Sequence, residues 1–138
     1  MTQQEAIDFI NANLACHLAT LDRGRPRVRG MLMYRAERDG IVFHTGTFKA
    51  LYGQLLADPS VELCFNDLKA GRQLRVEGRA VLVDDPALKR EIVESRPFLK
   101  GIARGETYEG MAVFRVVDLR MTTWTMATNM VPTSYEPW

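Results

Sequence analysis

Three arginines at alternating positions are the most informative candidates for a functional site in this sequence. They are Arg25, Arg27 and Arg29. Because successive side chains of a β-strand point to opposite faces, the three guanidinium groups share one face, while Val28 and Leu32 take the other. A row of cations can simply be a hydrated surface, and on their own the arginines favour that interpretation. They could also bind an anion.

The segment one hairpin later adds groups that suit a phosphate. Residues 41–44 predict a strand, which is followed by the hydroxyl groups of Thr45 and Thr47 and by Lys49. A helix that ends before Asp58 is predicted next, from apolar residues at helical spacing: Phe48, Leu51, Tyr52 and Leu55. We expect Thr47 to be its N-cap and Lys49 to lie in its first turn.

Lys49 stands where a lysine is usually unfavourable. The N-terminus of a helix carries free N–H groups and a partial positive charge, so a cation there costs about 0.3–1 kcal/mol unless an anion is bound. Together with Thr45, Thr47 and the arginines, Lys49 therefore predicts a phosphate-binding site. The alternative is an exposed lysine that extends into solvent without a partner.

Length and composition limit the classes of protein that remain. The 138 residues fit a single domain, residues 1–138, and the net charge is only +1. This balance argues against a protein whose main task is to coat nucleic acid. Fourteen of the eighteen basic residues are arginine, which suits forked contacts to phosphate and ring oxygens better than lysine does.

No segment indicates export or a membrane anchor. Residues 1–5 are polar and no apolar run is long enough to cross a bilayer, so we expect a cytoplasmic protein without a membrane partner. Cys16 and Cys64 stand alone within predicted strands, with no Cys-x-x-Cys spacing and no histidine cluster. We therefore expect buried, reduced thiols and no metal site.

Periodicity predicts six strands and three helices. The strands cover residues 16–21, 27–35, 41–45, 61–65, 73–83 and 111–125, with helices near 2–13, 47–57 and 85–96. Thr2 with Glu5 forms a capping box, and Asp85 is an N-cap followed by proline. Gly78 is expected to form a bulge or bend within its strand.

This order of elements predicts a small antiparallel barrel of the α+β class. The interior of a small barrel is filled by side chains, so a bulky ligand would have to bind on the outer wall. The face that carries Arg27 and Arg29 is the predicted place, and a second subunit could cover it. We therefore expect a symmetric homodimer with two equivalent sites.

The chain resembles the pyridoxamine 5′-phosphate oxidase-like flavin-binding split barrels. The resemblance extends from Leu18 to Asp84-Asp85-Pro86 and, more weakly, to the end of the chain. The resemblance rests on these sequence segments: Ala19-Thr20-Leu21, Gly24-Arg25-Pro26-Arg27-Val28-Arg29, Val42-Phe43-His44-Thr45, Lys49 with Gln54-Leu55 and Asp58-Pro59, and Gln73-Leu74-Arg75-Val76-Glu77-Gly78. The resemblance implies a mainly β fold of the α+β class, a six-stranded antiparallel split β-barrel with flanking helices. It also implies FMN bound across a homodimer interface.

Carried over by position, the resemblance implies a role for each candidate residue. Arg27 and Arg29 would contact the ring and phosphate region of FMN, and Lys49 would contact the phosphate with the two threonines. Gln73 would reach the cofactor from a neighbouring strand, while Trp124 either flanks the ring or is a core or interface tryptophan. The complete set of candidate cofactor-binding residues is Arg27, Val28, Arg29, Thr45, Thr47, Lys49, Gln73, Arg75 and Trp124.

Two departures from the oxidase pattern concern the substrate. Tyr34 stands where the oxidase has a lysine for the substrate phosphate, and residues 126–132 replace a C-terminal Arg-x-His signature. Pyridoxamine phosphate is therefore not the expected substrate. The ending 124–129 is similar to a small branch near the nitroimidazole-resistance reductases. This implies an oxidoreductase that reduces a small electrophilic or aromatic substrate, with a nicotinamide nucleotide as a candidate electron donor. No catalytic residue is assigned.

Four alternatives remain open at this point. A haem-binding barrel would need His17 or His44 as axial ligand, and a deazaflavin enzyme could use the basic residues 69–75. A flavin-binding protein without turnover would have the same sequence features. A barrel that binds single-stranded nucleic acid would use basic and aromatic residues, namely Arg72, Arg75, Arg79 and Phe65, although the near-zero net charge argues against it.

Overall fold

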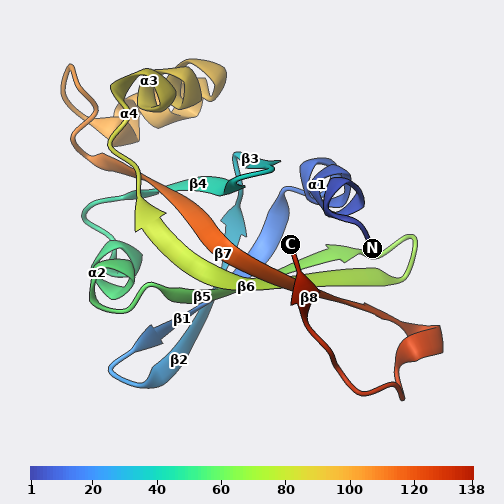
Figure 1. Ribbon diagram of the computed structural model, residues 1–138. Helices are drawn as coiled ribbons and strands as arrows, with labels where there is room; N and C mark the ends of the chain where they lie inside the picture. The colour runs from blue at the N-terminus through green and yellow to red at the C-terminus, as the bar shows by residue number, and fades with distance from the viewer.

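The computed structural model describes residues 1–138, which form one curled antiparallel sheet with helices around it (Figure 1). The strands are β1 (Ala15–Asp22), β2 (Arg25–Leu32), β3 (Arg35–Glu37), β4 (Gly40–Gly46), β5 (Ser60–Asp67), β6 (Arg72–Leu82), β7 (Met111–Thr125) and β8 (Glu136–Pro137). The helices are α1 (Gln3–Ala12), α2 (Ala50–Ala57), α3 (Pro86–Ser95) and α4 (Lys100–Ala103), with 3-10 turns at Pro97–Leu99 and Met126–Thr128. The mainly β, α+β class is confirmed, and the six predicted strands are joined by two short ones, β3 and β8.

The sheet stays open because its two end strands, β2 and β3, are not paired with each other. Its order is β2-β1-β5-β6-β7-β4-β3, and β8 pairs with β7. The chain passes from the β2 end of the sheet to the β3 end between Met33 and Tyr34. The Met33 N–H donates to the Leu14 carbonyl (2.9 Å), whereas the Tyr34 N–H donates to the Val42 carbonyl (2.8 Å). The single strand predicted over residues 27–35 is therefore wrong, because adjacent amides bond to different neighbours.

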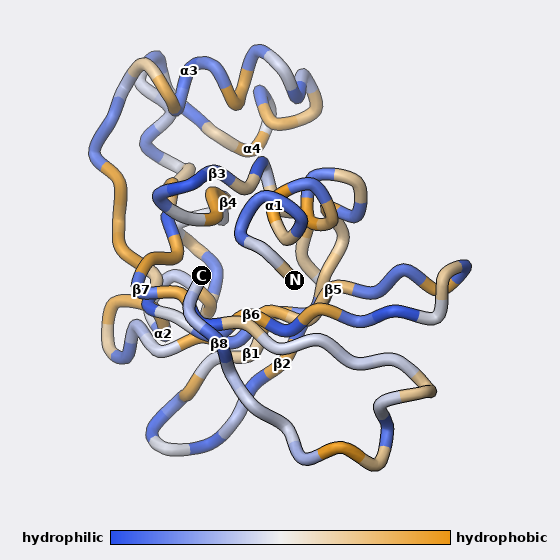
Figure 2. The backbone as a smooth tube through the Cα atoms, turned by 45° about the vertical axis from the view of Figure 1, so that its right-hand side comes forward, coloured by the Kyte–Doolittle hydropathy of each residue, from blue (hydrophilic) through white to orange (hydrophobic).

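Two apolar cores lie on opposite faces of the sheet. The main core fills the inside of the curl under α1 and α2, and its largest fully buried side chains include Phe43, Phe65 and Phe114. The second core lies between β4, β7 and α3–α4, and it consists of Val42, Leu88, Ile92, Val93, Leu99, Ala103, Met111 and Val113. Figure 2 shows the β5–β6 hairpin extending from this body with mostly hydrophilic residues. Helix α4 was not predicted, because the sequence over residues 98–110 has no clear period.

The predicted starts of α1 and α3 are confirmed by their capping bonds. The Glu5 N–H donates to Thr2 Oγ1 (3.2 Å), and the Thr2 N–H donates to the Glu5 carboxylate (2.7 Å). The Asp85 carboxylate accepts from the N–H groups of Ala87 (3.0 Å) and Leu88 (3.1 Å). These bonds satisfy N–H groups that have no partner within the helix.

The predicted bulge at Gly78 is confirmed by a shift in the β6–β7 register between Glu77 and Arg79. A Cβ at Gly78 would lie 2.7 Å from the Val117 carbonyl oxygen. We expect Gly78→Ala to lower the free energy of unfolding by about 1–3 kcal/mol in urea denaturation, because backbone must move. Gly53→Ala in α2 is the matched control, since a Cβ there meets nothing within 4 Å. Equal stability of the two variants would contradict this account of the bulge.

Several features bear on the classes of site that the fold can hold. No helix combines the length and the hydrophobicity required to cross a lipid bilayer. The thiols are free, with Cys16 buried as predicted and Cys64 only half-buried. Burial raises the pKa of Cys16 to about 12. No group of three or more His, Cys, Asp or Glu side chains is placed to hold a metal ion.

Candidate functional site

The candidate residues lie on the two different faces of the sheet. In the β1–β2 register Arg27 pairs with Thr20 and Arg29 with Leu18, so both arginines share the inner face with buried residues. Val28 points to the outer face and is 69% exposed. The prediction that Arg27 and Arg29 lie on the outer wall is therefore wrong. Alternation separated the arginines from Val28 correctly, but only strand pairing shows which side faces the core.

Arg29 ties β2 to β1 and α2. Its guanidinium donates to the Leu18 carbonyl (3.2 Å), to Thr20 Oγ1 (2.8 Å) and to Gln54 Oε1 (2.6 Å). Burial, and to a lesser extent the charge of Arg27, lowers the pKa of Arg29. Arg27 is more exposed and contacts only Asp22, at 3.4 Å. Arg29 is thus a fixed cation beside α2.

Helix α2 begins two residues later than predicted. Lys49 is its N-cap, and Thr47 and Phe48 lie in the turn before it, so the predicted N-cap at Thr47 is wrong. The reason is the backbone pairing of the turn, in which the Thr47 N–H donates to the Gly110 carbonyl (3.0 Å) and the Lys49 N–H to the Gly46 carbonyl (3.1 Å). Phe48 is consequently 58% exposed instead of packing in the helix.

The N-terminus of α2 has no partner of opposite charge. No side chain caps it, its first turn has no acidic residue, and Lys49 is exposed without an ion pair. Free N–H groups, the helix dipole and an ammonium group therefore converge at one end of α2. The positive charge at this end of α2 still favours a bound phosphate, as predicted from Lys49, although Lys49 is the N-cap and not a first-turn residue.

Strand β4 places Thr45 and His44 on opposite faces. Thr45 is buried on the inner face, opposite Ala112 of β7. The Nε2 atom of His44 accepts a hydrogen bond from Arg96 Nη1 at 2.9 Å. Burial, with the charges of Arg96 and Lys49, lowers the pKa of His44 to about 4. His44 is therefore neutral at pH 7, and its Nε2 is already engaged.

The neutral His44 predicts a pH dependence of stability. Between the ordinary pKa of 6.5 and the folded value of about 4, the unfolded chain binds a proton that the folded chain does not. We expect stability to be full above about pH 6.5 and to fall by about 3 kcal/mol as the pH approaches 4. Urea denaturation across this range should show a decrease in the free energy of unfolding at low pH. The contribution of His44 to this decrease should be absent in His44→Gln. Parallel pH profiles of the two proteins would contradict it.

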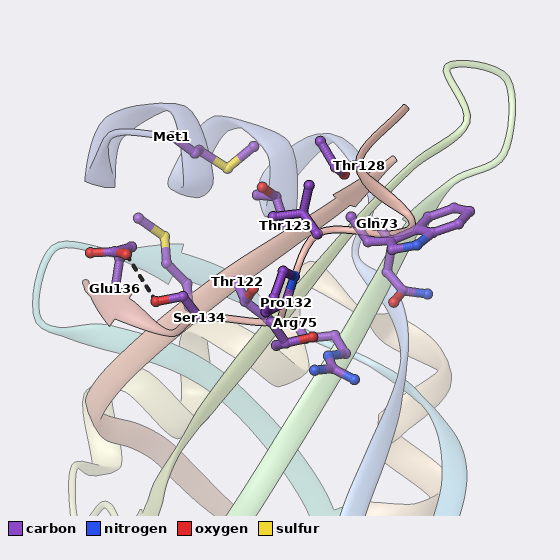
Figure 3. A pocket seen from close by; sticks show the side chains of 13 residues that line it. Met1, Gln73, Arg75, Thr122, Thr123, Thr128, Pro132, Ser134 and Glu136 are labelled. Atoms are coloured by element: carbon purple, nitrogen blue, oxygen red, sulfur yellow. Dashed lines mark hydrogen bonds between the residues drawn. The ribbon is translucent and has the colours of Figure 1, made fainter. Parts of the chain in front are cut away.

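Four side chains of the outer face, on adjacent strands, line a cavity at the edge of β7. Gln73 of β6 is paired with Trp124 of β7, and Arg75 with Thr122, so the four side chains share one face. The cavity has a volume of about 330 Å³ (Figure 3). Its other lining residues come from the chain ends and the remainder of β7: Met1, Met121, Thr123, Thr128, Val131, Pro132, Thr133, Ser134 and Glu136.

The C-terminal segment, residues 126–138, covers this cavity and is attached at its far end. The Trp138 N–H donates to the Leu119 carbonyl (3.1 Å), and Arg120 donates to the Tyr135 carbonyl (2.9 Å). The Tyr135 hydroxyl donates to Glu62, and burial together with that carboxylate raises the pKa of Tyr135 to about 12. The segment is thus held in place by side chains as well as by β8.

Comparison with known proteins decides the family. A family model described as pyridoxamine 5′-phosphate oxidase matches residues 2–127. The chain belongs to this family. Pyridoxine/pyridoxamine 5′-phosphate oxidase of Haemophilus influenzae (strain 86-028NP) is 36% identical over 83 residues, covering 59% of this chain and 40% of that protein. The oxidase of Zymomonas mobilis is 34% identical over 128 residues, covering 72% and 67%. The chain spans about two fifths of the length of the first of these relatives.

Solved structures of three other proteins share the fold. A NimC/NimA family protein from Clostridium acetobutylicum matches with a TM-score of 0.78 at 21% identity, covering 98% of this chain and 92% of that one. A pyridoxamine 5′-phosphate oxidase-related, FMN-binding protein from Nostoc punctiforme has a TM-score of 0.65 at 14% identity, covering 99% and 96%. A FAD-binding protein from Mesorhizobium loti has 0.67 at 15%, covering 91% and 96%. The predicted resemblance and the split-barrel fold are confirmed.

Within this member of the oxidase family, eight of the nine candidate residues form two separate groups, and Val28 lies apart, exposed on β2. The anion group comprises Arg27 and Arg29 of β2, Thr45 of β4, and Thr47 and Lys49 just before α2, and Arg29 reaches α2 through Gln54. The cavity group comprises Gln73, Arg75 and Trp124 on the outer face. No hydrogen bond or ion pair joins the two groups within one chain. Sequence reasoning gave no role to Gln54, which holds Arg29, or to Tyr135, which contacts the cavity group. Gln54 had a signal, since it is a polar residue beside the apolar stripe of α2.

Proposed function

We propose that this chain is an FMN-dependent oxidoreductase that works as a homodimer and reduces a small electrophilic or aromatic substrate. The observation that carries the proposal is the anion group, because its cations and free N–H groups suit a phosphate monoester. Membership of the oxidase family supports it, as does the fold shared with proteins described as FMN-binding and FAD-binding. FMN is preferred over FAD because the anion group accounts for one terminal phosphate.

The donor set fits the phosphate end of FMN. Arg29 is held rigidly by three hydrogen bonds, whereas Lys49 and the N–H groups at the start of α2 have no competing anion. Thr47 lies in the turn that leads into the helix. A guanidinium, an ammonium, a hydroxyl and backbone N–H groups are the groups that bind phosphate in proteins. In this proposal they would fix one end of the cofactor.

The separation of the two groups supports a dimer. Residues on opposite faces of one sheet would not both reach a single cofactor unless two chains contribute. Strand β2 is an end strand, and its outer-face residues Val28 and Leu32 are 69% and 45% exposed. Exposed apolar side chains on such a strand suit burial against a second copy. The anion group of one chain would then hold the phosphate, and the cavity group of the other would meet the ring.

Bound flavin would supply the exchange of electrons, and the protein would supply position and electrostatics. Arg27 and Arg29 place positive charge near the cofactor, which favours negative charge on a reduced ring. Trp124 offers an indole face for stacking, and the amide of Gln73 is oriented by its hydrogen bond to Asn66 Oδ1 (2.9 Å). A nicotinamide nucleotide is the proposed electron donor. None of these residues is required to act as a general base.

Two alternatives are weakened by particular contacts. A haem ligand at His44 would have to give up the bond from Arg96 to Nε2. A surface for single-stranded nucleic acid would lack its aromatic platform, because Phe65 is fully buried, and Arg79 is paired with Asp118 at 2.8 Å. A deazaflavin cofactor and a flavoprotein without turnover remain the alternatives that experiment must separate.

Light scattering and turnover assays test the proposal. The protein at micromolar concentration is expected to have the mass of two chains, and a monomer would contradict the shared site. The FMN-loaded protein is then mixed with NADH or NADPH and with a nitroaromatic compound or a quinone. Oxidation of the nucleotide that depends on the acceptor supports an oxidoreductase. If the flavin-loaded protein oxidises neither nucleotide with any of these acceptors, the result would indicate a flavin-binding protein without turnover.

A further inference from the structure

A network of charged side chains lies beside the cavity in which the proposed function places the flavin ring. Arg75 is the only cationic side chain that lines this cavity. Its Nε atom lies 3.3 Å from Glu62 Oε1, whereas its two Nη groups donate no hydrogen bond within the chain. Figure 3 shows Arg75 and Gln73 extending in the same direction from β6. Glu62 therefore holds the guanidinium by one edge and leaves the Nη fork free for a ligand in the cavity.

Tyr135 joins this network from the C-terminal segment. Its hydroxyl donates to Glu62 Oε1, the same oxygen that faces Arg75. The centroid of the Tyr135 ring lies 5.6 Å from the guanidinium carbon of Arg75 and 5.9 Å from that of Arg120. The Glu62 carboxylate is thus shared between a hydroxyl and a guanidinium, and both partners fix its position.

The pairing of β5 with β6 explains why each glutamate of the network needs an arginine. Glu62 is directly opposite Glu77, and like charges at such positions repel each other. Glu77 is in turn opposite Arg120, whose Nη1 lies 3.1 Å from Glu77 Oε1. Neither Glu77 nor Arg120 lines the cavity. The network therefore holds two similar ion pairs, of which only the pair of Glu62 with Arg75 reaches the cavity wall.

The charge that Arg75 presents to the cavity matters for a flavin. A hydride brings two electrons and one proton, so the ring gains one negative charge when it is reduced. A cation beside the ring favours the reduced form, and a carboxylate that offsets the cation opposes it. We propose that Glu62, held by Tyr135, offsets the charge of Arg75 and so lowers the reduction potential of the bound FMN. The inference rests on the proposed function, because it requires the flavin ring to occupy this cavity.

Glu62 is a positioning residue in this proposal, since it contacts Arg75 and does not line the cavity. The hydroxyl that holds it belongs to the C-terminal segment, which covers the cavity. The reduction potential of FMN therefore depends on that segment being in place.

Reductive titration of the FMN-loaded protein with dithionite, in the presence of a redox dye, tests the proposal. Glu62→Gln keeps an acceptor oxygen for both partners but removes the charge. It should raise the potential by about 30 mV, which for a two-electron couple is about a tenfold change in the ratio of affinities for reduced and oxidised flavin. Glu77→Gln is the matched control, because it removes the same charge from the opposite strand position, and its shift should be less than about a third as large. Equal shifts in the two variants, or no shift in Glu62→Gln, would overturn the inference.

The variant Tyr135→Phe separates an effect of charge from a loss of structure. Without the hydroxyl, more of the Glu62 charge faces Arg75, so the potential should fall, by about two- to threefold in the same ratio of affinities. A purely structural role predicts shifts of the same sign in Tyr135→Phe and Glu62→Gln, because both variants weaken the same bond to the C-terminal segment. Shifts of opposite sign support the proposal, and shifts of the same sign contradict it.

FMN retention is measured separately, from the flavin absorbance of each protein after desalting. An unsubstituted protein that retains no FMN contradicts the proposed function. A protein that retains FMN and has the same potential in Glu62→Gln contradicts the role of Glu62 alone. The two failures are therefore distinguishable.

Discussion

Replacing Arg29 and Lys49 together with alanine will weaken FMN binding by on the order of a hundredfold or more, because each loses a charge-assisted contact worth about 1.5–3 kcal/mol. Lys49 has no internal partner, so its loss should act on the cofactor alone. Arg29 also holds Thr20 and Gln54, so part of its effect will come from movement of α2. Titration of flavin fluorescence gives the affinities.

Two controls separate binding from folding in this experiment. Lys69→Ala removes another exposed lysine, in the β5–β6 hairpin, and should leave FMN affinity unchanged. Lys49→Ala alone should lower the affinity about tenfold without a change in melting temperature. If the double variant binds FMN as tightly as the original protein, the anion group is not the phosphate site.

Replacing Phe114 with alanine should lower the free energy of unfolding by about 3–5 kcal/mol, the usual cost of removing a buried aromatic ring. Phe114 is 1% exposed, and its ring centroid lies 5.6 Å from that of Phe43 and 6.2 Å from that of Tyr52. Tyr52 belongs to α2, so the cavity would also loosen the helix beside the anion group. Urea denaturation measures the loss.

Phe98→Ala is the matched control for the core substitution. Phe98 is 63% exposed, so its removal should change stability by no more than about 0.5 kcal/mol. Similar losses for Phe114→Ala and Phe98→Ala would contradict the assignment of Phe114 to the main core. A loss limited to Phe114→Ala, with weaker FMN binding in that variant, would connect the core to the site through Tyr52.

Local patterns predicted much of the fold. The capping box at Thr2, the N-cap at Asp85 and the bulge at Gly78 each depend on residues close in sequence, and all three are confirmed. Strand alternation also separated the arginines from Val28 correctly. These features follow from backbone geometry and short-range hydrogen bonds, which a single sequence displays directly.

Features set by distant pairing could not be predicted in the same way. The helix after β4 starts at Ala50 because the Thr47 amide bonds to Gly110, a residue far along the chain. The strand predicted through Tyr34 breaks because its amide bonds to β4. The cover over the cavity depends on Tyr135 reaching Glu62 across the sheet. Each of these contacts joins residues whose proximity exists only in the folded chain.

The central claim is that the anion group and the cavity group together hold FMN. The most direct test is the visible absorption spectrum of the protein purified without added cofactor, and again after incubation with FMN and desalting. The account predicts a flavin spectrum that survives desalting in the second sample and is lost in the Arg29→Ala/Lys49→Ala variant. A haem-like Soret band, a bound deazaflavin, or no retained chromophore in either sample would contradict it.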